Sequence, residues 1–280
     1  MRFLICDRSI GRKVKMFKKC IITVTFITLL FASLSFAQID KIAIYTENVS
    51  WTDAATATAA ADFIMKNVKS ANDIKVYNEA DIATFAKDNT KDGNFDIIIT
   101  FGYFPVSLYT PPNVDADGSV AENFLYGGDM ILNTADYIFY VSKEINGDAA
   151  LKNITNSALD MWCDDNAQKN TPTDDGKKYA PSIPATATTA TRAFKIDQIA
   201  AEKDWQLEMA FSSNGANYID PAIIINKTNG GRVGIVFQTG DATPRAEVIT
   251  EIINNYLAGN ITAVKANDKL PLTWGQIKAD

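Results

Sequence analysis

Four apolar runs in the sequence end in short turns that carry polar and aromatic side chains. The runs cover residues 41–46, 95–101, 129–133 and 233–237. The side chains at or just beyond their ends are Glu47, Trp51, Tyr103, Phe104, Tyr109, Asn133, Thr134, Gln238, Thr239, Asp241 and Arg245. The carboxyl ends of parallel strands meet at one edge of a sheet, where ligands gather. Aromatic faces stack on the C–H faces of sugars, and carboxylates and amides bind hydroxyl groups. The set therefore predicts a site for a small polar ligand, with a carbohydrate as one candidate.

Two carboxylates in this set permit a catalytic interpretation. Glu47 and Asp241 could supply the acid and base of a hydrolase or isomerase with a carbohydrate-like substrate, provided that both face one cavity within about 10 Å of each other. A structural interpretation is equally open: the carboxylates cap helices, and Tyr103 and Phe104 pack a loop. Arg245 falls in the first turn of an expected helix, where a positive charge opposes the helix dipole. Arg245 is therefore expected to bind Asp241, Glu47 or an anionic ligand, or to form an ordinary surface ion pair.

The chain contains no histidine. This absence excludes Ser-His-Asp and Cys-His-Glu catalysis and histidine-rich zinc sites. Of the three cysteines, only Cys163 lies beyond residue 37. Without a histidine to activate it, Cys163 is expected to be a buried apolar residue rather than a nucleophile. The neighbouring Asp164 and Asp165 offer too few oxygens for a divalent cation, so neither a metal nor a cofactor is predicted.

Residues 16–37 have the pattern of a secretory signal, with a short basic end, an apolar run, and the small residues Ser35 and Ala37. We expect cleavage after Ala37, with Met16 as a candidate start, so that residues 1–15 would be a mis-assigned extension. A membrane anchor is less favoured because the apolar run is short for a bilayer span. The sequence predicts a secreted or periplasmic protein that keeps no stable membrane anchor after cleavage.

Removal of the signal would leave a strongly acidic protein. Residues 1–37 hold seven of the 27 Lys and Arg residues and one of the 33 Asp and Glu residues. The rest of the chain keeps 20 basic and 32 acidic residues, a net charge of −12. Because phosphate binding needs a basic face, nucleic acid is excluded as a partner.

Strand and helix patterns alternate along residues 38–260, which we expect to form one domain. Strands are predicted at 41–46, 73–78, 95–101, 129–133, 205–211, 221–226 and 232–239, and helices at 50–70, 79–93, 120–126 and 243–258, with Ser50 as the candidate cap of the first helix. The alternation predicts an α/β fold of flavodoxin-like or Rossmann-like type, doubly wound, with a mostly parallel sheet and helices on both faces. The turn KTNGG at 227–231 predicts a C-terminal β-hairpin.

Three segments do not fit this alternation. Residues 134–145 have a strand-like centre but a position that suits a helix. Residues 164–190 are loop-like, which favours a lid, a binding insertion or a plain surface loop. Residues 261–280 form a C-terminal tail, whose Trp274 is expected either to pack on the domain or to bind a partner.

The order of these parts resembles the class I glutamine amidotransferase-like superfamily, and most closely its ThuA-like branch. The resemblance spans most of residues 40–258 and is carried by KIAIYTE, FDIIITFGYFP, VAENFLYGGDMILNTAD and GGRVGIVFQTGD. It implies the fold and the place of the site. In amidotransferases a Cys occupies the sharp turn after a central strand, with His and Glu further on. That turn matches Asn133-Thr134-Ala135 here, and the ThuA-like histidines match Asn133 and Asp241. The resemblance therefore does not imply the family's reaction.

Three functions are compatible with the sequence. The first is an exported, non-catalytic amidotransferase-like domain that binds a small polar ligand at the carboxyl edge of the sheet. The second is a carboxylate-based hydrolase or isomerase that uses Glu47 and Asp241. The third is a surface protein-interaction module that uses residues 164–190 and the tail.

Overall fold

A seven-stranded sheet forms the centre of the fold. The computed structural model describes residues 39–110, 118–140, 149–160 and 168–261. In spatial order the strands are β2 (Ala71–Tyr77), β1 (Ile39–Tyr45), β3 (Ile97–Phe101), β4 (Met130–Thr134), β12 (Arg232–Val236), β11 (Ala222–Asn226) and β8 (Trp205–Ala210). The first five are parallel, and β11 runs antiparallel to both of its neighbours. The order 2-1-3-4 is that of flavodoxin-like folds, which confirms the predicted α/β class and the C-terminal hairpin β11–β12.

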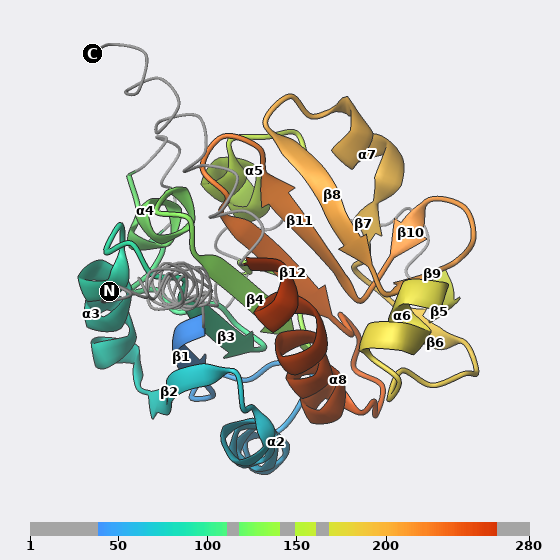
Figure 1. The fold of residues 1–280 in the computed structure, drawn as a ribbon, viewed down its shortest axis with the longest axis horizontal. Helices are drawn as coiled ribbons and strands as arrows, with labels where there is room; N and C mark the ends of the chain where they lie inside the picture. Colours follow the sequence, from blue (N-terminus) through green and yellow to red (C-terminus); the bar gives the residue numbers. More distant parts are fainter. Residues whose placement is uncertain (1–38, 111–117, 141–148, 161–167, 262–280) are drawn as a thin grey trace, which may run out of the picture. The chain divides into compact units, whose positions relative to one another are not determined.

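Helices connect the parallel strands and cover the sheet (Figure 1). They are α2 (Ala54–Asn67), α3 (Glu79–Asn89), α4 (Val120–Tyr126), α5 (Ala149–Thr155) and α8 (Arg245–Glu251), which continues as a π-helix, Ile252–Leu257. Side chains start three of them: Asp53 caps α2, Asn78 caps α3, and Ser119 forms a capping box with Glu122 at α4. The cap predicted at Ser50 is wrong, because the N-cap of α2 is Asp53, three residues later.

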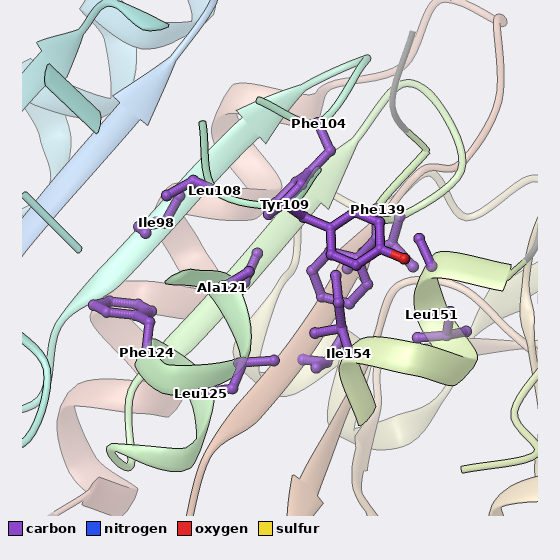
Figure 2. Packing of buried hydrophobic residues seen from close by; sticks show 14 of the residues in the cluster. Ile98, Phe104, Leu108, Tyr109, Ala121, Phe124, Leu125, Phe139, Leu151 and Ile154 are labelled. Atoms are coloured by element: carbon purple, nitrogen blue, oxygen red, sulfur yellow. The ribbon is translucent and has the colours of Figure 1, made fainter. Parts of the chain in front are cut away.

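The strands near the centre are buried on both sides. All five residues of β3, β4, β11 and β12 are buried, as expected for strands with helices on both faces. On one face, rings and aliphatic side chains from α3, α4, α5 and the turn after β3 form a continuous core around Phe104, Phe124 and Leu151 (Figure 2). On the other face, α2 and α8 contact each other.

A second, smaller sheet lies in the part of the chain predicted to be a loop. Its strand order is β6 (Thr188–Ala190), β5 (Gln168–Pro172), β9 (Ser212–Ser213), β10 (Tyr218–Ile219) and β7 (Phe194–Lys195). Two short helices, α6 (Asp174–Tyr179) and α7 (Ile196–Ala201), belong to the same region. The loop-like reading of residues 164–190 is therefore wrong for 168–190. The strands are too short and too polar to show an alternating pattern, and β5 pairs with β9 about 40 residues later in the chain.

Several predictions fall on residues outside the described ranges. They concern the signal segment 1–37, Cys163 with its two neighbouring aspartates, and Trp274. Residues 135–140 of the ambiguous segment form turns rather than a strand or a helix. In the described part of the chain, no helix combines the length and apolar character needed to cross a membrane.

Candidate functional site

The turns after β1, β3, β4 and β12 are joined by backbone hydrogen bonds at the carboxyl edge of the sheet. Trp51 N–H donates to the Ala135 carbonyl at 3.2 Å, Gly102 N–H to the Thr134 carbonyl at 2.8 Å, and Tyr103 N–H to the Asn48 carbonyl at 3.0 Å. A Cβ on Gly102 would lie 2.4 Å from the backbone nitrogen of Ser50. Glycine is therefore required for the turns after β1 and β3 to approach this closely. The edge is a connected framework and not a set of independent loops.

Four partly buried aromatic rings form a row on this framework. The ring centroids of Trp51 and Tyr137 are 5.2 Å apart, those of Tyr137 and Tyr140 are 5.2 Å apart, and those of Tyr140 and Tyr103 are 5.8 Å apart. We call these four residues the aromatic row. They come from the turns after β1, β3 and β4, and so lie where the strand order reverses between β1 and β3, the place where open α/β sheets bind ligands. The sequence singled out Trp51 and Tyr103 but not the two tyrosines of the ambiguous segment.

A carboxylate and a guanidinium flank the aromatic row. Asp136 is 1% exposed, accepts the Tyr137 N–H at 2.6 Å, and is hydrogen-bonded to Ser50. Burial raises the pKa of Asp136 to about 6, against the opposing effect of its hydrogen bonds and of Arg192. The Arg192 guanidinium lies 4.3 Å from the Tyr137 ring centroid and donates to the Tyr137 hydroxyl. Neither residue was predicted from the sequence, although Asp136 stands only three positions beyond a predicted strand.

Buried polar side chains support the framework from behind. Asn133 donates to Thr100 Oγ1 at 2.8 Å and to the Gly102 carbonyl at 3.0 Å, and Gln238 donates to the Asn133 carbonyl at 2.9 Å. Asn133 Oδ1, Thr134 Oγ1 and Gln238 Oε1 are buried and have no hydrogen-bond partner among the described residues. Because all three side chains are closed off from solvent, they hold the turns in place, and a surface ligand does not contact them.

Asp220 and Arg245 hold the turn after β12 through bonds to its backbone. Asp220, fully buried, accepts the N–H groups of Phe237 and Gln238, each at 2.7 Å. Arg245 is also buried and donates to the carbonyl oxygens of Thr239 at 2.5 Å and Asp241 at 2.9 Å. Burial lowers the pKa of Arg245 and raises that of Asp220 to about 7, and the opposite charges partly offset both shifts. The role of Arg245 shown by these bonds is to hold the chain between β12 and α8.

Glu47 and Asp241 are exposed, as catalytic or binding residues would be, but each takes part in local structure. Glu47 Oε2 accepts the N–H of Glu79 at 2.7 Å, at the first residue of α3. Asp241 contributes its backbone carbonyl to Arg245, and its N–H donates to Thr239 Oγ1 at 3.2 Å. Glu47 therefore caps a helix, one of the two interpretations that the sequence left open.

Phe104 and Tyr109 belong to the core. Phe104 is 0% exposed and packs edge-on against Phe139 at 5.0 Å, and Tyr109 is 1% exposed, with its hydroxyl accepting from Asn153 at 3.0 Å (Figure 2). Both residues pack α4 and α5 against the sheet. Their rings cannot stack on a ligand at the surface.

A cavity of about 240 Å³ adjoins this edge between α2 and α8. It is lined by Thr52, Thr56, Ala59, Ala60, Phe63, Phe101, Thr243, Arg245, Ala246 and Glu247. Its volume is below the range of about 300–1,000 Å³ typical of drug-sized pockets. It can accommodate only a small group.

The backbone at the end of β4 has the geometry of a sharp, strained turn. Ala135 has φ 64° and donates its N–H to the Phe237 carbonyl at 3.3 Å, and Phe237 itself has φ 53°. Left-handed conformations cost non-glycine residues of order 1–3 kcal/mol and concentrate at functional sites. The residue in this turn is alanine, whose methyl group cannot act as a nucleophile or a base.

Comparison with known proteins finds likeness in structure and none in sequence. No family model matches the chain, and a search of curated proteins finds no significant match. Among solved structures, the chain is similar to the crystal structure of a protein from Bacteroides uniformis ATCC 8492 that is described as ThuA-like. The two are 12% identical, the match covers 78% of this chain and 91% of that one, and the TM-score is 0.42. A likeness of this size concerns the fold at most, and the chemistry of the site rests on its own residues.

Proposed function

We propose that this protein is an exported domain that binds a small polar ligand of the carbohydrate type at the carboxyl edge of its large sheet, without amidotransferase catalysis. The observation that carries the proposal is the aromatic row, four partly exposed rings in mutual contact at the point where the strand order reverses. Rings that are partly solvated and held by a hydrogen-bonded framework offer apolar faces at little cost in conformational entropy.

The polar groups of the aromatic row itself suit hydroxyl groups. Asp136 and Arg192 are buried, at 1% and 5% exposed, so they orient the row rather than contact a ligand. Arg192 lies over the Tyr137 ring and donates to its hydroxyl. The partly exposed tyrosine hydroxyls of the row can donate and accept hydrogen bonds. A row whose rings carry no charge favours a neutral, hydroxyl-rich ligand over a strongly charged one.

The residues of the strained turn argue against the family's reaction. The turn that the resemblance matches to the amidotransferase Cys, Asn133-Thr134-Ala135, contains no Cys, and the chain has no histidine to act as a base. A turn that keeps its strain without a nucleophile positions the neighbouring aromatic side chains. Export rests on the signal pattern of residues 16–37 and is tested by the N-terminal sequence of the protein secreted or recovered from the periplasm, which should start at Gln38.

The test is a thermal-shift screen of monosaccharides, short oligosaccharides and nucleotides, followed by titration calorimetry of each hit. Trp51→Ala and Tyr140→Ala should each weaken saccharide binding at least about tenfold, the cost of one well-packed contact residue. Tyr218→Ala is the matched control, because Tyr218 is a partly buried ring on the small sheet. If no saccharide binds, or if all three variants bind alike, the proposal is wrong and an interaction module becomes the better account.

A further inference from the structure

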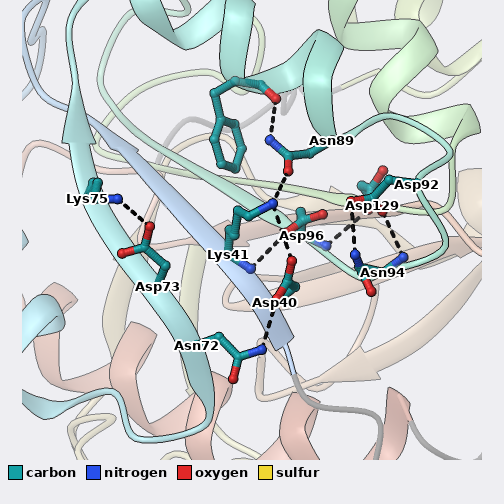
Figure 3. Close-up of polar contacts among 11 residues, drawn as sticks. Asp40, Lys41, Asn72, Asp73, Lys75, Asn89, Asp92, Asn94, Asp96 and Asp129 are labelled. Carbon is teal, nitrogen blue, oxygen red and sulfur yellow. Dashed lines mark hydrogen bonds and ion pairs between the residues drawn. The ribbon is translucent and has the colours of Figure 1, made fainter.

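Aspartates gather at the opposite, amino edge of the large sheet. Asp40 is the second residue of β1, Asp96 immediately precedes β3, and Asp129 immediately precedes β4. The register pairs Ile42 with Ile97 and Ile97 with Met130, so Asp96 and Asp129 lie in one row with Lys41. Asp92 reaches the same place from the turn after α3 (Figure 3). None of these residues belongs to the aromatic row or its framework.

Three of the carboxylates converge. One oxygen each from Asp40, Asp92 and Asp96, here named the aspartate cluster, lie within 4.8 Å of one another. Asp96 is 0% exposed, and its Oδ1 accepts the Lys41 N–H at 2.7 Å. Its Oδ2 is buried and has no hydrogen-bond partner among the described residues, and Figure 3 shows an Asp96 oxygen directed toward Asp92. A buried carboxylate oxygen without a donor is a costly feature that a bound cation would explain.

The local positive charge does not balance this group. Lys41 Nζ donates to Asn89 Oδ1 at 2.6 Å and lies 3.3 Å from Asp40 Oδ2. Its charge also attracts the carboxylates of Asp96 and Asp92. α3 also ends here, at Asn89, and the C-terminus of a helix carries partial negative charge that favours cations. One ammonium therefore faces three carboxylates and a helix C-terminus.

We propose that the aspartate cluster binds a Ca²⁺ ion. Its ligands are all oxygens, which hard divalent cations prefer. Two ligand oxygens of one Ca²⁺ ion can be at most about 4.8 Å apart at a Ca–O distance of about 2.4 Å, and the three carboxylate oxygens lie within that limit. Ca²⁺ also tolerates irregular coordination, whereas Mg²⁺ demands near-ideal octahedral geometry. Asp92 is exposed and Asp40 is partly exposed, so water can complete the six to eight ligands that Ca²⁺ takes.

The ion would tie the start of β1 to the start of β3 and to the turn that follows α3. Three carboxylates with open coordination positions correspond to the weaker class of calcium sites, with Kd of about 10⁻⁴–10⁻³ M. Because a ligand that binds only the folded state raises its stability, Ca²⁺ should raise the melting temperature by a few degrees. Mg²⁺ should raise it less.

The experiment is calorimetric titration of the EDTA-treated protein with CaCl₂ and with MgCl₂, together with thermal melts. Asp92→Asn should weaken Ca²⁺ binding about tenfold or more, while its remaining oxygen can still accept the Asn94 N–H that now bonds to Asp92 at 2.8 Å. Asp88→Asn is the matched control, because Asp88 is an exposed aspartate one helical turn earlier and lies outside the cluster. This substitution removes the same charge. The Ca²⁺ affinity of the control variant should stay within about twofold of the parent.

Three results would overturn the proposal. They are the absence of a calorimetric signal and of a melting shift at about 10 mM Ca²⁺, an equal effect of the two variants, and binding of Mg²⁺ as tight as that of Ca²⁺. Circular dichroism of both variants checks that they fold. Because the cluster and the aromatic row lie at opposite edges of the sheet, failure here leaves saccharide binding untouched, and the reverse also holds.

Discussion

Replacing Arg245 with methionine should destabilise the protein strongly, and more at alkaline than at acidic pH. The guanidinium is 7% exposed, donates to the carbonyl oxygens of Thr239 and Asp241, and lowers the pKa of the buried Asp220 carboxyl. Methionine keeps a similar length and apolar stem but removes the donors and the charge. The substitution therefore leaves two carbonyl groups without their donor and removes the positive charge that lowers the pKa of Asp220.

The size of the effect follows from these contacts. Each hydrogen bond from a charged donor contributes about 1.5–3 kcal/mol, and removal of one member of a buried charge pair costs about 3–5 kcal/mol. We expect a loss of about 3–4 kcal/mol in the free energy of unfolding at about pH 8.5. Burial raises the pKa of Asp220 from 3.8 to about 7 in the folded protein. The stability that this carboxyl contributes is therefore full below its unfolded pKa and is lost as the pH rises through about 7.

Without Arg245 the pKa of Asp220 rises further, which extends this loss to higher pH. At about pH 5.5 Asp220 largely keeps its proton with or without Arg245, so the penalty should be smaller there. Urea denaturation followed by circular dichroism at both pH values measures the difference. Lys66→Met, at an exposed position near the end of α2, is the control and should change stability by less than about 0.5 kcal/mol. A loss below about 1 kcal/mol for Arg245→Met at alkaline pH, or equal losses at both pH values, would refute the reasoning.

Three further predictions concern stability. Glu47→Ala should lower the unfolding free energy by about 1 kcal/mol through loss of the contact with the start of α3, as measured by urea titration; unchanged stability with lost ligand binding would contradict this role. Phe104→Ala should cost about 3–5 kcal/mol in the same assay by opening a core cavity, and the neighbouring Tyr103→Ala should cost clearly less; equal losses would count against it. The parent protein should lose stability between about pH 5 and pH 8, because burial raises the pKa values of Asp136 and Asp220 to about 6 and about 7; a rise in stability over that range would disagree.

The large sheet was predictable because its strands obey simple patterns. Residues 97–101 and 130–134 are buried on both faces, so each run begins with at least three consecutive apolar residues and is easy to recognise. The C-terminal hairpin was predictable as well, because the KTNGG turn is a short, local signal for two paired strands. The small sheet was not predictable, since residues 168–172 are polar and pair with strands distant in sequence. Tertiary pairing, not local propensity, determines their structure.

The edge of the sheet was predictable from the sequence, but the residues that face solvent there could not be told apart from those that support them. Phe104 and Tyr103 are adjacent, yet one ring enters the core and the other joins the aromatic row. Which of the two rings enters the core depends on the left-handed turns and close backbone contacts of the framework. These features leave no periodic pattern in the sequence. Arg192 was missed for a related reason, because it comes from a Thr- and Ala-rich segment about 55 residues after Tyr137, with which it forms its contact.

The indole N–H signals of the tryptophans in an ¹⁵N–¹H NMR spectrum test ligand binding at the aromatic row most directly. Trp51 lies in the row, whereas Trp205 is buried and donates its indole N–H to the Thr155 carbonyl at 2.7 Å. Titration with a saccharide from the thermal-shift screen should move the Trp51 signal, assigned through Trp51→Phe, and leave the Trp205 signal in place. A saccharide that binds while the Trp51 signal stays unchanged would contradict the proposed site.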